Sequence, residues 1–427
     1  MKTRLTAYRY IFILLAIMII FQVPALGELN PDASGDYLYE ETAGGIIITG
    51  YTGEDTALVL PSVLDGKAVI AVRSLGIQSG VERITIPDDV HVIGNPFSGC
   101  YTLTGFDVSP SHPELCAVDG ILFSKDMTQL IRYPSERENE VYVISGGVRT
   151  ICNSAFSDCP FLKEIQIPDT VESIGSGAFC LCTGLKELHI PSGVKIVGKM
   201  AFGNTGLQSM DLSTCAITEI PDRLFYGCYA LEEVKLSPAV TSIGSEAFAF
   251  TNLKSFTLPS GIKHIGINPF RDCQFLHGFQ VDSNIQEFAY DAPYLIDLTE
   301  SRLIACITTV DASLTLPEVM EIGDYCLAAN HSLVHLIIPP SVVRIGNGAF
   351  TECLSLEDVL IQECTNLHIA KLAFSDCSSL THVTVLADIS ILEEDIFSRD
   401  DSLQEISSNS AVLQEYCQTN SLPFTSR

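Results

Sequence analysis

The chain has 427 residues, of which 47% are hydrophobic, so it can bury a large core and does not have the composition of a disordered protein. Its 52 acidic and 24 basic residues give a formal net charge of -28, which argues against a nucleic-acid partner and against docking on an anionic membrane surface. We interpret this charge as a means of keeping an exported protein soluble.

Residues 1–27 have the composition of a secretory signal peptide. Lys2, Arg4 and Arg9 form a positive start, and an uninterrupted apolar run at 11–21 follows. The run is short for a membrane span, so we expect cleavage rather than an uncleaved anchor. After cleavage we expect no membrane insertion, and we predict a secreted, extracellular protein that can also associate with the cell surface.

Residues 28–80 read as an N-terminal β cap. They contain "IIITGYTGEDTALVLPSVLDGKAVIAV", in which apolar strand-like runs are separated by Gly and Asp turn signals. A solenoid needs an atypical unit at each end to cover the open edge of its first and last coil. The final residues, 410–427, predict the second cap, with a short helix followed by an extended piece.

Between these caps, residues 81–409 repeat one motif. The unit from Leu162 to Cys182 reads "LKEIQIPDTVESIGSGAFCLC", and eleven copies can be recognised by the phenylalanine, or in one copy the leucine, at the second position of its Ala-Phe pair. The spacing of this marker is 22 to 24 residues outside two interruptions. The marker residues are Phe97, Phe156, Phe179, Phe202, Phe225, Phe248, Phe270, Leu327, Phe350, Phe374 and Phe397.

Each position of the unit has a physical interpretation. The I-x-I segment alternates apolar and polar residues and predicts a short strand with one buried face, which the proline then ends. The glycine is expected to make a tight bend, and the Ala-Phe pair to fill the interior. Because so short a unit cannot close a core alone, we predict a solenoid, a superhelix of about 23-residue coils. It should have a parallel β-sheet on one side and short turns or 3-10 segments on the other.

Two longer intervals in the repeat predict hairpin insertions, near 105–145 and 278–316. Their sequences "GILFSKDMTQLIRY" and "PYLIDLTESRLIAC" each place two apolar strands around a polar turn. We expect each insertion to lengthen one coil without breaking the stack.

The placement of the cysteines follows the repeat and not a disulfide framework. Seven of the 15 cysteines lie three residues after the marker, where other coils have Thr, Asn or Asp. This pattern predicts a ladder of unpaired thiols in a small, half-buried slot, although adjacent residues such as Cys159 and Cys182 could come within disulfide distance. The spacings do not match a zinc site. The seven residues are Cys100, Cys159, Cys182, Cys228, Cys273, Cys353 and Cys377.

The 23-residue unit resembles the BspA-like leucine-rich repeat of bacterial surface proteins. The cap segment quoted above, the insertion "DGILFSKDMTQLIRYP" and the tail "VLQEYCQTNSLPF" are similar to segments that recur in this family. Leu327 in place of Phe, the glycine-free "CAITEIPDRLF" and the irregular stretch 367–374 depart from the pattern. The resemblance implies a leucine-rich repeat fold, secretion or surface display, and binding of a protein or of host matrix.

No motif for catalysis, nucleotide binding or a metal occurs, so we predict no cofactor and no enzymatic activity. The binding surface is expected to be the row of outward residues in the I-x-I strands. This row consists of Thr85, Gln166, His189, Asp211, Lys235, Thr257, Ile337, Leu360 and Thr384. A neighbouring row, one residue before each strand's first apolar position, includes Glu164, Glu187, Glu233, His335, Asp358 and His382.

Ile337 and Leu360 differ from the rest of the first row because they are apolar. Either a loop or a neighbouring chain covers them, or they form a small hydrophobic contact patch. We predict a monomeric, non-enzymatic interaction or adhesion scaffold for a protein or glycoprotein ligand, host or matrix proteins among them. The alternatives are a structural, self-associating surface protein and a carbohydrate-active enzyme, which would need two close carboxylates in a cleft.

Overall fold

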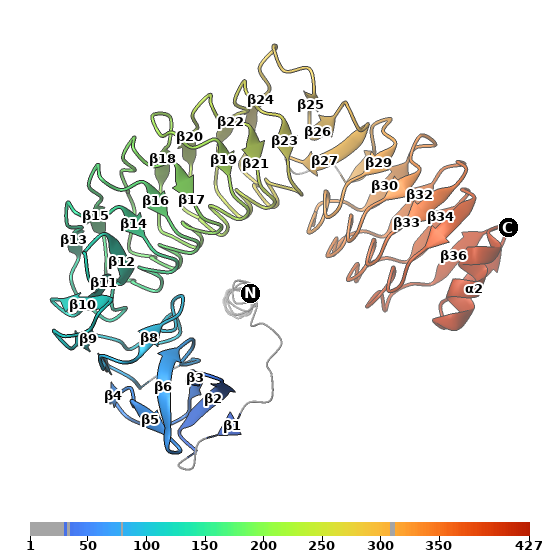
Figure 1. The fold of residues 1–427 in the computed structure, drawn as a ribbon. Coiled ribbons are helices and arrows are strands. Elements are labelled where there is room, and N and C mark those ends of the chain that lie inside the picture. The colour runs from blue at the N-terminus through green and yellow to red at the C-terminus, as the bar shows by residue number, and fades with distance from the viewer. Residues whose placement is uncertain (1–29, 32–34, 78–79, 308–311) are drawn as a thin grey trace.

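A computed structural model shows coils stacked side by side along an arc, with an N-terminal sheet at one end and helix α2 (Ala411–Thr419) at the other (Figure 1). The predicted signal peptide lies outside the described residues, and within them no helix is long and apolar enough to span a bilayer. The structure describes residues 30–31, 35–77, 80–307 and 312–427.

Most coils contribute two short strands, which stack into two strips, here called the A strip and the B strip. Pairing between successive coils is parallel and in register, which confirms the predicted solenoid. The A strip contains β4 (Ala57–Val59), β7 (Arg83–Ile86), β9 (Gly105–Val108), β13 (Val141–Val143), β15 (Glu164–Gln166), β18 (Ser209–Asp211), β20 (Glu233–Lys235), β22 (Ser255–Thr257), β24 (Gly278–Gln280), β28 (Ser313–Thr315), β30 (His335–Ile338), β32 (Asp358–Ile361), β34 (His382–Val385), β36 (Glu405–Ser408) and β37 (Phe424–Ser426).

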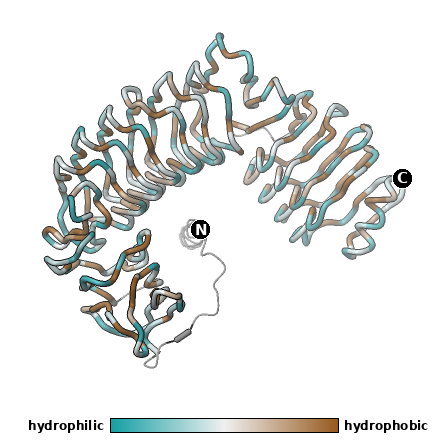
Figure 2. Tube along the Cα trace, viewed as in Figure 1, coloured by the Kyte–Doolittle hydropathy of each residue, from teal (hydrophilic) through white to brown (hydrophobic). Residues whose placement is uncertain are grey.

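The B strip follows the A strip along the stack and is formed by shorter strands. It contains β6 (Lys67–Val72), β8 (His91–Val92), β12 (Gln129–Arg132), β14 (Thr150–Ile151), β16 (Ser173–Ile174), β17 (Ile196–Val197), β19 (Glu219–Ile220), β21 (Ser242–Ile243), β23 (His264–Ile265), β27 (Arg302–Cys306), β29 (Glu321–Ile322), β31 (Arg344–Ile345), β33 (Leu367–Ile369) and β35 (Ile389–Leu392). Figure 2 shows hydrophobic residues recurring from coil to coil in both strips.

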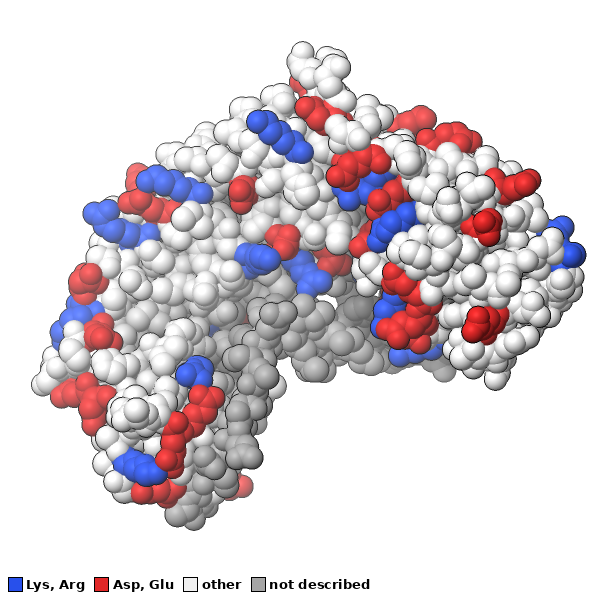
Figure 3. All heavy atoms as spheres, turned by 45° about the vertical axis from the view of Figure 1, so that its right-hand side comes forward, with Lys and Arg blue, Asp and Glu red and all other residues white. Residues whose placement is uncertain are grey.

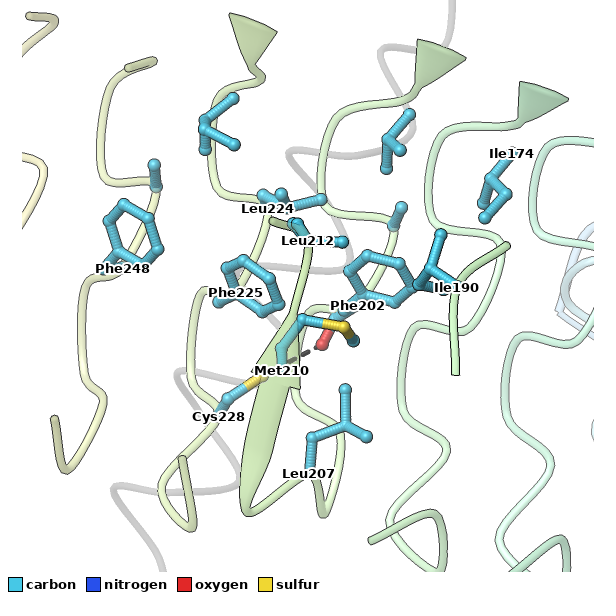
Figure 4. Close-up of a cluster of buried hydrophobic side chains, with 14 of the residues drawn as sticks. Ile174, Ile190, Phe202, Leu207, Met210, Leu212, Leu224, Phe225, Cys228 and Phe248 are labelled. Atoms are coloured by element: carbon cyan, nitrogen blue, oxygen red, sulfur yellow. Dashed lines mark hydrogen bonds between the residues drawn. The ribbon is translucent and has the colours of Figure 1, made fainter. Parts of the chain in front are cut away.

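The marker aromatics stack on one another through the interior. Phe156 and Phe179 have ring centroids 5.2 Å apart and an interplanar angle of 9°, and the same stacking continues to Phe270. Figure 4 shows Phe202, Phe225 and Phe248 as part of this ladder. Because each ring is fully buried between its neighbours, the 23-residue repeat sets the position of every coil.

Except at Gly94, which has a φ of 71° and nothing within 4 Å of an added Cβ, the recurring glycine permits close approach of neighbouring coils and does not make the bend that we predicted for it. A Cβ added at Gly175 would lie 2.5 Å from the Asn153 backbone nitrogen, and the φ of Gly175 is outside the left-handed region. The bend instead uses left-handed residues two before and two after the aromatic. In the coil of Phe156 these are Ser154 and Asp158, with φ values of 52° and 57°.

The cysteine slot supplies a hydrogen-bond donor to the preceding coil. Cys182 Sγ donates to the Phe156 carbonyl at 3.0 Å, and Cys228 Sγ donates to the Phe202 carbonyl at 2.9 Å (Figure 4). Thr205, in the same slot, instead donates its hydroxyl to the Phe202 carbonyl of its own coil at 2.9 Å. All seven slot cysteines are free thiols, in agreement with the predicted ladder, but their slot is fully buried and not half-buried as we predicted.

Each insertion is an antiparallel hairpin whose strand faces pack into different cores. They add β10 (Leu115–Val118) and β11 (Ile121–Ser124) before β12, and β25 (Phe288–Asp291) and β26 (Tyr294–Asp297) before β27. On β11, Leu122 packs into the core of the N-terminal coils, here called the first core. Ile121 and Phe123 pack into the second core, which belongs to the coils between the two hairpins. On β27, Ile304 packs into the second core, whereas Leu303 packs into the third core, which belongs to the coils after the second hairpin.

Because successive side chains of a strand point to opposite faces, each hairpin forms a wall between two cores. The predicted hairpins are confirmed, but they divide the core that we expected to be continuous. We refer to residues 35–120 as the N-terminal stack, to 121–307 as the middle stack and to 312–427 as the C-terminal stack.

Two asparagines bridge the hairpins on the turn side. Asn95 Nδ2 donates to the Asn153 carbonyl at 2.8 Å, and Asn268 Nδ2 donates to the Tyr325 carbonyl at 2.5 Å. In a regular coil a backbone N–H makes the equivalent contact, as Ser154 N does with the next coil. The side-chain amide therefore replaces a backbone donor that the hairpin coil lacks.

The two ends of the solenoid have different covers. The N-terminal sheet pairs β1 (Asn30–Pro31), β2 (Tyr37–Thr42) and β3 (Gly45–Tyr51) antiparallel, and β5 (Val63–Leu64) joins its far side against β6. At the other end α2 begins at the N-cap Ser410 and buries Leu413 and Cys417 against the third core. Both covers shield apolar groups that a further coil would otherwise bury.

Candidate partner-binding face

Eight of the nine predicted contact residues point outward from A strands, and His189 occupies the equivalent outward place in a coil without an assigned A strand. Their exposure differs along the molecule. Five, all in the middle stack, are exposed: Gln166, His189, Asp211, Lys235 and Thr257. The other four are half-buried: Thr85, Ile337, Leu360 and Thr384.

The C-terminal stack brings three of these residues into direct register. Ile337 on β30 pairs with Leu360 on β32, which pairs with Thr384 on β34. These strands belong to a six-stranded parallel sheet, β28-β30-β32-β34-β36-β37. Thr315 and Ser407 continue the same column on either side. The two apolar side chains therefore lie next to each other, with hydroxyl-bearing residues at both ends.

In the other two stacks the predicted row is less continuous. Asp211 is in register with Lys235, but Thr85 lies between Val59 and Asp107, which the predicted row omitted. The row also omitted Val143, 60% exposed and in register with Gln166. We missed these residues because the repeat motif was not traced into the cap and the insertions.

The neighbouring row contains a line of three interacting side chains in the C-terminal stack. His335 Nδ1 lies 2.8 Å from Asp358 Oδ2, and His382 Nδ1 lies 3.3 Å from Asp358 Oδ1. All three side chains are about half exposed, at 49%, 51% and 47% for His335, His382 and Asp358. Both imidazoles thus share one carboxylate directly beside Ile337 and Leu360.

The middle stack presents different chemistry in the same two rows. Glu164, Glu233 and Asp211 are exposed there, and Lys235 pairs with Glu233 on its own strand at 3.3 Å. Its outward row from Gln166 to Thr257 is polar or charged throughout. Figure 3 shows acidic and basic side chains intermingled over the face in view, with white surface between them. An apolar pair in register among the predicted residues is thus a feature of the C-terminal stack.

The turn side of the second hairpin contains a cavity of about 220 Å³. It lies between the turns 268–274 and 326–332 and adjoins Ile307, which precedes the segment 308–311 outside the described residues. Among its described lining residues Asp272 is the single carboxylate, whereas glycoside hydrolysis uses two. Elsewhere in the described chain no group of three or more His, Cys, Asp or Glu is arranged to hold a metal.

A family model described as the BspA type leucine rich repeat region matches residues 149–277 and 308–423, in 6 copies. No curated protein matches the chain. A leucine-rich cell surface protein from Faecalibacterium prausnitzii is 20% identical, with a TM-score of 0.48, over 92% of this chain and 97% of that one.

Two further solved structures cover nearly all of the chain. A leucine-rich repeat protein from Bacteroides ovatus is 18% identical, with a TM-score of 0.40, over 95% of this chain and 100% of that one. The pneumococcal vaccine antigen PcpA is 17% identical, with a TM-score of 0.40, also over 95% of this chain and 100% of that one.

Proposed function

This chain belongs to the BspA-type leucine-rich repeat family, and we propose that it acts as an exported, non-enzymatic scaffold that binds a protein or glycoprotein outside the cell. Export is supported by the signal-peptide composition of residues 1–27. Binding is supported by the solenoid architecture, because stacked coils present long rows of outward side chains as a continuous surface.

The adjacency of Ile337 and Leu360 carries the proposal. Both are half-buried side chains on the outward face of a six-stranded sheet, where every other member of the column has a hydroxyl group. An apolar centre within a polar rim is the usual anatomy of a protein-binding surface. We assign this part of the C-terminal stack as the contact site for an apolar side chain of the partner.

A capture experiment with purified extracellular-matrix proteins and host glycoproteins tests this assignment. The mature chain is immobilised, and the double variant Ile337→Asp, Leu360→Asp is compared with wild type. We expect it to lose affinity at least about tenfold, because two charges would be desolvated at the contact. The matched control is Gln166→Asp, Thr257→Asp, which adds the same charges to the A strip of the middle stack and should retain capture.

Capture of no protein, or equal capture by all three chains, would contradict the proposal. Light scattering separates the scaffold function from self-assembly, since we expect the mature wild-type chain to be a monomer. An oligomer that dissociates in the Ile337→Asp, Leu360→Asp variant would mean that this face binds a second copy. Turnover of any member of a glycan panel would contradict a non-enzymatic role.

A further inference from the structure

The line His335–Asp358–His382 fixes how protons are distributed next to the contact site. His335 Nδ1 and His382 Nδ1 lie 2.8 Å and 3.3 Å from the two oxygens of the Asp358 carboxylate, which carry only lone pairs, so each Nδ1 is placed to carry a proton. His382 Nδ1 also lies 2.9 Å from the Thr381 hydroxyl, which itself donates to the Glu357 carbonyl at 3.0 Å. That hydroxyl therefore accepts from His382 as well.

The other ring nitrogen of each histidine is consequently an acceptor when the imidazole is neutral and a donor when it is charged. With neutral imidazoles the line thus offers an imidazole acceptor, a carboxylate and a second imidazole acceptor on successive strands. Glu405, in register with His382 on the next strand, adds another carboxylate. Ser313 precedes His335 in the column, so the column contains no lysine or arginine from β28 to β36.

A row of acceptors and carboxylates beside an apolar pair is complementary to a segment that carries cationic donors around an apolar residue. A protonated imidazole carries a positive charge and donates at both ring nitrogens, so protonation converts an acceptor of this row into a charged donor. Imidazole is the side chain whose ordinary protonation range falls between pH 5 and 8. The same face would then repel the partner that it attracted.

We propose that the His335–Asp358–His382 line makes this face bind a lysine- or arginine-bearing protein segment at neutral pH and release it in acid. This inference rests on the proposed function, because it assumes that Ile337 and Leu360 form the contact. It adds the charge of the partner and the condition under which the complex dissociates.

The test uses a short synthetic peptide of alternating lysine and leucine, whose affinity for the full mature chain is measured at pH 7.5 and pH 5.5. We expect the wild-type affinity to fall about tenfold in acid, since protonation of an imidazole places a positive charge near the bound lysines. The variant His335→Gln, His382→Gln retains a side-chain donor toward Asp358 but does not titrate. It should bind equally well at both pH values.

A peptide of alternating glutamate and leucine serves as the charge control, and it should bind more weakly than the lysine peptide at pH 7.5. Thermal unfolding at both pH values establishes that each chain is folded during the measurement. The inference is overturned if wild type binds the lysine peptide equally at both pH values, if the glutamine variant loses affinity as much as wild type, or if the lysine peptide does not bind. In the last case, capture of a purified protein that depends on Ile337 and Leu360 would leave the proposed function standing.

Discussion

One position in each coil, three residues after the marker aromatic, accepts Cys, Thr, Asn or Asp. The sequence indicated a small slot, and the structure shows why these residue types occur there. A slot thiol donates to the buried marker carbonyl of the preceding coil, and a slot hydroxyl donates to the marker carbonyl of its own coil. Burial raises the pKa of the Cys228 thiol to about 11 and that of Cys273 to about 12, so both remain protonated donors at neutral pH.

Substitution of Cys182 tests this role with a nearly isosteric pair. Cys182→Val removes the donor to the Phe156 carbonyl and should lower the free energy of unfolding by about 1 to 2 kcal/mol. Cys182→Thr keeps a hydroxyl donor in the slot, which at Thr205 and Thr251 bonds the marker carbonyl of the same coil, and it should cost less than the valine. Urea denaturation measures both variants, and equal stability of the two would show that the slot requires only volume.

Asp400 occupies the same slot and makes stability depend on pH. Burial raises the pKa of its carboxyl from 3.8 to about 8, and its Oδ1 accepts from the Cys377 backbone N–H at 2.7 Å. The folded chain therefore binds the proton more tightly than the unfolded chain. The contribution of Asp400 to the free energy of unfolding is therefore present below pH 4 and is lost as the pH rises toward 8.

We predict that Asp400→Asn leaves stability nearly unchanged at pH 4 and raises it at pH 9 by roughly 2 kcal/mol relative to wild type. The amide retains an acceptor for the Cys377 N–H and needs no proton to be neutral. Thermal unfolding of both proteins across this range provides the measurement. A constant difference between them at every pH would contradict the titration of Asp400.

The turn that follows each B strand depends on contacts between coils that a single unit does not reveal. The sequence placed a glycine at the bend, but in the structure the left-handed residues of the bend are elsewhere. Gly175 is small because the backbone of the preceding coil lies against it. The motif therefore marked the right residue, but the reason that we gave for its glycine was wrong. A repeated glycine is compatible both with a tight bend and with the close approach of a neighbouring backbone.

Gly175→Ala should lower the free energy of unfolding by about 2 kcal/mol, because its Cβ would meet backbone atoms at 2.5 Å and 2.6 Å. Gly146→Ala is the control, since nothing lies within 4 Å of a Cβ at that position and its φ is outside the left-handed region. We expect the control to stay within about 0.5 kcal/mol of wild type. Similar denaturation midpoints for the two variants would argue against the close-approach explanation.

The hairpins also had a local signal that sequence reasoning left unused. Each is preceded by Asn-Pro-Phe, at 95–97 and 268–270, and the asparagine spans the hairpin coil in both cases. The strands and turns of the hairpins were predictable from alternating apolar residues. Their packing into two cores was not predictable from the sequence. A strand with apolar residues on both faces does not indicate which other elements cover each face.

Over the whole molecule, three cores are joined at two hairpin walls, and Arg271 links the second and third on the turn side. Its guanidinium contacts Glu246 of the middle stack at 3.5 Å and Glu352 of the C-terminal stack at 3.1 Å. The Arg271 side chain is 12% exposed, whereas the paired Arg83 in the N-terminal stack is 47% exposed.

Arg271→Ala should uncouple the C-terminal stack from the middle stack, because it leaves a partly buried carboxylate without its partner across the wall. We expect a loss of about 2 kcal/mol and faster hydrogen exchange in residues 312–427 than in 121–307. Arg83→Ala, which removes an exposed pair with Asp107, should cost under about 1 kcal/mol and leave exchange in both stacks unchanged. Uniform acceleration of exchange along the solenoid in the Arg271 variant would refute a local role at the wall.

The sequence by itself determined the coil, its length, its slots and the rows of outward residues, because the periodicity of a repeat is a local signal that each unit restates. It also placed His335, Asp358 and His382 in one row. Only the tertiary structure decided that both imidazoles turn to the same carboxylate and that Ile337 lies against Leu360 in register. It likewise decided that the hairpins divide the core. These features depend on contacts between coils, which arise from register and side-chain orientation and leave no periodic trace in the chain.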